Sequence, residues 1–265
     1  MSARPESVAA SRPAAVRDEA GDRHDRHDSA LAGATTGAEN VPWSRAIYAV
    51  LRREWALVMA RPVDLLVQAL FFITVASLPA LGVSPTPETL ALLAPGVLWV
   101  AVLLCVLVAS WRCFHDDLRS GWLDQWALCG VPLVLLVAAR LAAQWVATVV
   151  PVLLLAPVAA LQYGLSGAAL GVLMVALLPG VAVLVMLVGV VAALSAGLRQ
   201  GGMLVIGLVL PLAAPVLVFG SLAVHAAQLG EPAGAHLALL AGMACAMLAC
   251  CPWLAASAVR IGIES

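Results

Sequence analysis

Six apolar stretches, each about as long as a membrane-spanning helix, constrain this 265-residue sequence more than any other feature. A helix that crosses a bilayer needs about 20 mostly apolar residues. The chain is 63% hydrophobic and only 11% charged, whereas soluble domains are about a quarter charged. We therefore predict an all-α integral membrane protein with six transmembrane helices. The predicted spans cover residues 64–82, 89–111, 134–160, 168–195, 203–224 and 236–258.

The first 42 residues differ in composition from the rest. They are rich in Arg, Asp and Glu, contain no aromatic residue and show no apolar periodicity. Such a segment cannot bury enough surface to offset its chain entropy, so we predict a disordered N-terminal extension over 1–42. His24 and His27 could bind a metal, but a solvated polar tail is the simpler interpretation. Residues 43–265 then form a six-span membrane domain.

Residues 43–61 predict an amphipathic helix that lies at the membrane surface. Apolar side chains such as Leu51 and Trp55 recur at helical spacing, while charged ones such as Arg53 fall mostly elsewhere. Pro62 ends this helix.

Arginine placement predicts the orientation, since arginines and lysines accumulate in cytoplasmic loops. The 14 basic residues are all arginines, and the loops GVSPTPE, LQYGLSG and HAAQLGEPAGA contain none. The opposite set of segments holds Arg45, Arg52, Arg53, Arg61, Arg112, Arg119, Arg199 and Arg260. Both termini are therefore expected in the cytoplasm. Asp64 and Arg140 fit near the cytoplasmic ends of their spans, where a long side chain reaches the interface.

Familiar catalytic and metal-binding motifs are missing. The sequence has no GxxxxGK[ST] loop, no HExxH and no GxSxG, and the six cysteines lack the spacing of a metal site. We expect no zinc, no structural disulfide, no nucleic-acid partner and no enzyme activity in this chain. It is interpreted as one subunit of a machine whose enzymology lies in another subunit.

The stretch WRCFHDDLRSGWLDQW, residues 111–126, interrupts the apolar sequence and is called the coupling segment below. On a helical wheel, Trp111, Trp122 and Trp126 share one face with other apolar residues, whereas the charges occupy the opposite face. Leu123 is the exception, because it lies on the polar face. The pattern predicts a helix over 112–129 that lies at the cytoplasmic surface, anchored by the three tryptophans.

The coupling segment also carries a family resemblance. Phe114, Asp117 and Gly121 form a Phe-x-x-Asp-x-x-x-Gly pattern, followed by the sequence WLDQ. With LLAPGVLWVAVLL before it and LRQGGMLVIGLVLPLAAPVLVF and PWLAASAVRI after it, the chain resembles the haem exporter protein B family. These are the membrane subunits of the cytochrome c maturation ABC transporters. The resemblance covers about residues 43–263.

The resemblance implies a type-2 ABC exporter permease in a bacterial inner membrane, involved in haem delivery to a periplasmic haem chaperone. It implies several partners: a separate ATPase subunit, a haem-handling membrane subunit, a small single-span subunit and a second copy of the chain. ATP would act only through the ATPase, and haem would be a ligand that is transported or handed over. The implied ATPase-coupling interface comprises Phe114, Asp116, Asp117, Arg119, Gly121, Leu123 and Asp124.

Alternatives stay open at this point. The subunit could instead be an energy-coupling module that releases the loaded chaperone while no haem crosses its spans, or an unrelated ABC-2 permease. His225 and His236 flank the last periplasmic loop and could contact haem, although histidines at helix ends are often only interfacial.

Overall fold

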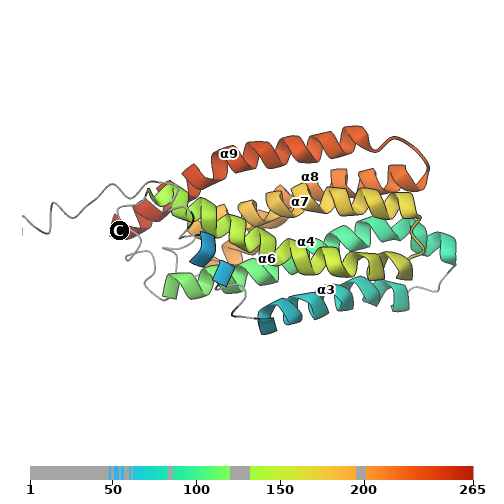
Figure 1. The fold of residues 1–265 in the computed structure, drawn as a ribbon, viewed down its shortest axis with the longest axis horizontal. Helices are drawn as coiled ribbons and strands as arrows, with labels where there is room; N and C mark the ends of the chain where they lie inside the picture. The colour runs from blue at the N-terminus through green and yellow to red at the C-terminus, as the bar shows by residue number, and fades with distance from the viewer. Residues whose placement is uncertain are drawn as a thin grey trace, which may run out of the picture. The chain divides into compact units, whose positions relative to one another are not determined.

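Long helices make up the described part of the chain (Figure 1). The structure is a computed structural model that describes residues 62–82, 86–119, 132–194 and 201–264, with Tyr48, 51–53, 55–56 and Ala60. Over 111–119, 201–206 and 258–264, and at residues 133 and 256, it describes the backbone alone. The helices are α3 (Pro62–Gly82), α4 (Pro87–Arg119), α6 (Leu133–Gln162), α7 (Gly167–Leu194), α8 (Gly201–Gln228) and α9 (Gly234–Glu264).

The six predicted spans are confirmed. Each of these helices contains an apolar window long enough to cross a membrane. Two of the connections at the end away from the C-terminus are tight turns (Figure 1). Gly164 and Gly230 end α6 and α8 with φ angles of 64° and 76°, a conformation that glycine adopts without steric cost. In each turn the backbone N–H groups bond back to the last carbonyls of the helix, as Leu165 does to Ala160 at 3.1 Å.

Helix α7 forms the centre of the bundle. Within its most apolar stretch of 18 residues, 72% are buried, against 17% in the corresponding stretch of α3 and 22% in that of α9. It packs against α4, α6, α8 and α9. Its apolar residues surround the whole helix, which is the pattern of a helix buried on all sides.

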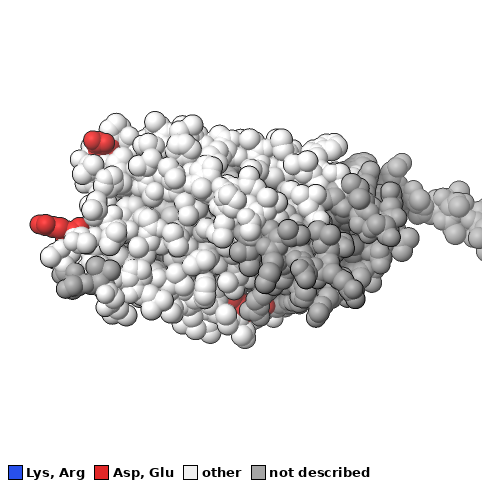
Figure 2. All heavy atoms as spheres, turned by 180° about the vertical axis from the view of Figure 1, so that it is seen from behind, with Lys and Arg blue, Asp and Glu red and all other residues white. Residues whose placement is uncertain are grey.

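The outer helices expose many large apolar side chains. Leu66, Leu154 and Leu248 are each more than half exposed. One face of the bundle is almost entirely uncharged in Figure 2, with acidic side chains at one end and at the lower margin. Such a surface suits the hydrocarbon region of a bilayer, where lipid tails cover the apolar side chains.

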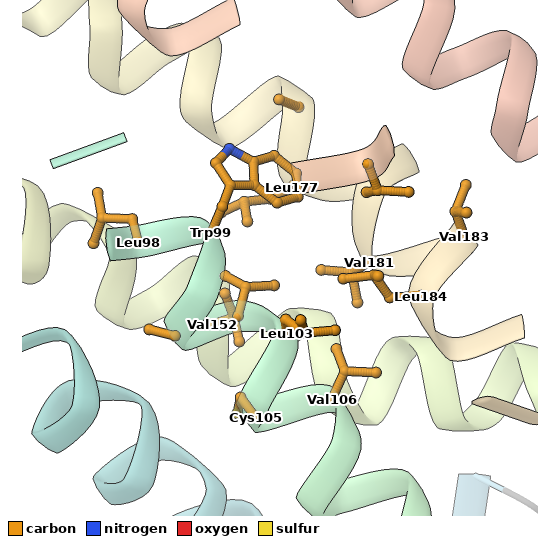
Figure 3. Close-up of a cluster of buried hydrophobic side chains, with 14 of the residues drawn as sticks. Leu98, Trp99, Leu103, Cys105, Val106, Val152, Leu177, Val181, Val183 and Leu184 are labelled. Carbon is orange, nitrogen blue, oxygen red and sulfur yellow. The ribbon is translucent and has the colours of Figure 1, made fainter. Parts of the chain in front are cut away.

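Trp99 of α4 occupies the tightest point of the core. Its side chain is 0% exposed and lies beside Leu177 of α7 (Figure 3). A Cβ added at Gly180 of α7 or at Gly220 of α8 would overlap the indole ring. The two glycines therefore allow α4 to approach α7 and α8 closely enough to enclose the ring.

Part of the predicted surface helix over 43–61 is described. Residues 51–53 and 55–56 are helical, as is Tyr48, and the side chains of Leu51 and Trp55 are 42% and 48% exposed. Both apolar side chains thus remain available to the membrane surface. The extension predicted over 1–42 lies outside the described residues.

Candidate functional site

The first half of the coupling segment is the end of α4. Trp111, Phe114, Asp116, Asp117 and Arg119 all lie on this helix, which runs unbroken to Arg119. The charged part of the sequence begins at Arg112, so residues 112–119 extend α4 by about 12 Å beyond its apolar part at 1.5 Å per residue. This charged extension projects from the same end of the bundle as the C-terminal end of α9 (Figure 1).

The continuity of α4 differs from the separate helix expected over 112–129. The sequence has no proline and no glycine between Gly96 and Gly121, so nothing in the chain breaks the helix after the span. Residues 112–119 therefore follow the direction of the span. Gly121, Trp122, Leu123, Asp124 and Trp126 lie outside the described residues, and their role at the interface stays a prediction.

Three of the other charged residues singled out from the sequence lie near this end of the bundle. Asp64 is in the first turn of α3, and Arg140 is the eighth residue of α6. Arg53 is exposed on the described helical part of 43–61. Arg199 lies outside the described residues. The positions of Asp64 and Arg140 within their helices fit side chains that reach the membrane surface.

The two candidate haem contacts lie on either side of the α8–α9 turn. His225 is in the last turn of α8, His236 is the third residue of α9, and both are half-buried. The Nδ1 atom of His236 is buried and has no hydrogen-bond partner within the described part of the chain. The described residues contain no group of three or more His, Cys, Asp or Glu side chains placed to hold a metal ion. Haem contact at these histidines remains a prediction.

Buried polar side chains inside the bundle bond to one another. Gln68 of α3 donates through Nε2 to the carbonyl of Thr148 in α6 at 3.3 Å, and Gln144 donates to the Thr148 hydroxyl at 3.2 Å. The Cys105 thiol of α4 donates to the Gln68 carbonyl at 3.6 Å. These groups tie α3, α4 and α6 together, so they are not available to line a polar path.

Side chains from distant parts of the chain bond to helix carbonyls near prolines. Pro95 lacks the N–H that would bond to the Ala91 carbonyl, and Gln228 at the end of α8 donates to that carbonyl at 3.0 Å. Pro79 lacks the N–H that would bond to the Val75 carbonyl, and the Tyr163 hydroxyl donates to the next carbonyl, that of Ala76, at 2.6 Å.

Gln68 makes a third bond of this kind, to the Thr148 carbonyl, which follows the Ala147 carbonyl that Pro151 leaves without an N–H partner. In the sequence, only the prolines indicate where such bonds lie. The donors come from distant helices and could not be found by spacing.

An apolar groove lies between α3 and α4. Its volume is about 330 Å³, and its lining contains only aliphatic side chains, proline and glycine. The lining residues are Val75, Pro79, Leu93, Gly96, Val97 and Val100. It offers no ligand for haem iron and no partner for a carboxylate.

Six apolar helices, one of them buried at the centre, with a charged helical extension at one end, define a multi-pass membrane protein of the permease class. The chain belongs to the CcmB protein family, whose family model matches residues 45–262.

Three relatives illustrate the similarity. Heme exporter protein B of Pseudomonas aeruginosa is 39% identical over 214 residues, which cover 81% of this chain and 96% of the relative. The protein of the same name from Haemophilus influenzae is 37% identical over 216 residues, covering 82% and 98%. That of Escherichia coli K12 is 36% identical over 194 residues, covering 73% and 88%. With the six apolar helices, these relatives indicate a multi-pass protein of a bacterial inner membrane.

Proposed function

We propose that this chain is the membrane subunit of a haem-export ABC complex that serves cytochrome c maturation. The relatives named heme exporter protein B, which match along most of the chain, carry the proposal. In this complex a separate ATPase subunit hydrolyses ATP, and the chain itself is not catalytic. Two copies of the chain form the membrane core, because an ABC core needs two membrane halves and this chain supplies one.

The coupling segment is the contact with the ATPase in this proposal. Its described half continues a span without a break, so a force applied at Asp117 acts directly on α4. Asp117 pairs with a basic group of the ATPase, and Leu123 fills an apolar pocket. A haem-handling membrane protein, a small single-span protein and the haem chaperone complete the assembly.

Co-purification tests the coupling role. The tagged chain is expressed with its ATPase, and the amount of ATPase retained is compared with the double variant Asp117→Ala/Leu123→Ala. We expect the double variant to lose most of the ATPase. The control is Glu231→Gln, an exposed change in the turn before α9, at the opposite end of the bundle, which should retain it. Undiminished ATPase binding by the double variant would refute the role of this segment.

One structural observation favours a second function, that of an energy-coupling module through which no haem passes. Gln68, Gln144 and Thr148 bond to one another, and the α3–α4 groove is wholly apolar. The discriminating measurement uses vesicles that contain only the chain and its ATPase. ATP-dependent haem accumulation supports transport, whereas no accumulation together with intact chaperone release by the full complex supports the module.

A further inference from the structure

Helix α4 joins the two ends of the bundle as one element. It has 33 residues, so it is about 50 Å long at 1.5 Å per residue. One end carries the coupling segment, and the other end carries Ala91, which is bonded to α8. A displacement of the charged end is therefore transmitted to the far end through one continuous helix.

Trp99 is the point at which α4 is held most closely. Gly180 of α7 and Gly220 of α8 leave no room for a Cβ against the indole ring. In the described part of the chain, Nε1 of Trp99 has no hydrogen-bond acceptor. The ring is thus held by packing alone, and a small tilt of α4 about it breaks no hydrogen bond there.

The far end of α4 is held differently. The Gln228 side chain donates to the Ala91 carbonyl at 3.0 Å, and Pro95 ensures that this carbonyl has no intrahelical N–H partner. A hydrogen bond is directional, and it weakens steeply once the distance exceeds about 3.5 Å. This bond therefore resists movement of the far end away from α8.

We propose that Trp99 is the fulcrum on which α4 tilts and that Gln228 is a latch which holds the far end of α4 against α8. The inference that an ATPase bound at the coupling segment drives this tilt rests on the function proposed above. Trp99 lies about 30 Å from Arg119 and about 12 Å from Ala91 along the helix. A displacement of about 1–2 Å at Arg119 therefore moves Ala91 by about 0.5 Å. This movement lengthens the hydrogen bond between Gln228 and the Ala91 carbonyl to about 3.5 Å, the distance beyond which it weakens steeply.

The latch is tested on the purified chain without any ATPase. Hydrogen–deuterium exchange is measured over residues 88–94 at the far end of α4. Gln228→Leu should accelerate exchange there about fivefold, the factor expected for one lost hydrogen bond. The matched control is Gln162→Leu, which removes the bond to Ser77 at the same end of the bundle but leaves α4 untouched. Equal exchange in Gln228→Leu and the wild type would overturn the latch.

The fulcrum is tested in the complex with the ATPase. ATP should accelerate exchange over residues 88–94 in the wild type, and Gly220→Ala should suppress that response because its Cβ overlaps the ring. Trp99→Phe combined with Gly220→Ala should restore it by making room. Gly242→Ala on α9, where a Cβ meets no atom within 4 Å, is the control.

Each outcome of the second test has a defined meaning. A wild-type response to ATP in Gly220→Ala, or no recovery in the double variant, overturns the fulcrum. If Gly220→Ala does not assemble, Trp99→Leu takes its place: a complex that binds ATPase but does not respond supports the fulcrum, and a normal response overturns it. Failure of the ATPase to bind the wild type refutes the proposed function, while the exchange test on the isolated chain still decides the latch.

Discussion

Tyr163 offers a sharp test of the bonds that side chains make to helix carbonyls near prolines. The chain has two tyrosines, and they lie in contrasting places. Tyr163 is 1% exposed and its hydroxyl donates to the Ala76 carbonyl at 2.6 Å, whereas Tyr48 is 67% exposed. Tyr163→Phe removes one oxygen atom and leaves the Ala76 carbonyl without that donor. Tyr48→Phe is the same chemical change at a surface position.

The expected loss of stability follows from two magnitudes. A single hydrogen bond contributes about 0.5–1.5 kcal/mol to stability, and hydrogen bonds measured inside membranes reach about 1.7 kcal/mol. We therefore expect Tyr163→Phe to lower the free energy of unfolding by about 1–2 kcal/mol. For a domain of this size that corresponds to a fall in Tm of about 2–8 °C. Tyr48→Phe should change neither quantity measurably.

The pH dependence provides a second readout for the same variant. Burial raises the pKa of the Tyr163 phenol above its usual value, and a backbone hydrogen bond with Ala80 partly opposes that shift. The unfolded phenol ionises near pH 10, so the stabilisation from a protonated Tyr163 is present below about pH 10 and is lost as the pH rises further. Thermal unfolding in detergent between about pH 8 and 11 measures this loss in the wild type. If Tyr163→Phe showed the same stability and the same alkaline slope as the wild type, the assigned hydrogen bond would be wrong.

Two other predictions concern the core and the topology. Gly180→Ala forces a Cβ into the Trp99 ring and should destabilise the bundle by about 1–3 kcal/mol. At the control position, Gly171→Ala places a Cβ with no atom within 4 Å and should be neutral or slightly stabilising. A smaller effect on thermal unfolding at Gly180 than at Gly171 would contradict the packing described. A cysteine placed at Glu231 should react with a membrane-impermeant maleimide added from the periplasmic side, and reaction from the cytoplasmic side alone would reverse the orientation inferred from the arginines.

The spans could be predicted from the sequence because the physical rule behind them is local. A run of apolar residues of sufficient length must cross the membrane as a helix, and its ends coincide with turn residues such as Gly164 and Gly230. The predicted limits of 134–160 therefore lie within three residues of the observed Leu133–Gln162.

The packing of the spans could not be predicted in the same way. In a bilayer every helix is apolar on most sides, so hydropathy does not reveal that α7 is central and α3 peripheral. The enclosure of Trp99 depends on Gly180 and Gly220, which are far from it in the sequence. The bond from the Gln68 side chain to the Thr148 carbonyl likewise joins two helices that no spacing in the sequence connects.

The first half of the coupling segment continues a span, which the helical wheel alone does not reveal. The helical wheel separated aromatic from charged side chains and so indicated a helix at the membrane surface. The same residues contain no helix breaker between the span and Gly121, and the structure continues α4 as far as Arg119.

The bonds at the prolines also bear on how the protein is made. Ala76 and Ala91 lie in the first two spans, but their donors, Tyr163 and Gln228, belong to parts of the chain that are synthesised later. When spans enter the bilayer in chain order, α4 arrives with an Ala91 carbonyl that no neighbour can yet satisfy, and α3 arrives before the donor that bonds to Ala76. Their final association must wait for α6 and α8, so the early helices need water, lipid headgroups or the insertion machinery at those positions. Biogenesis of this bundle is therefore completed late, by its C-terminal half.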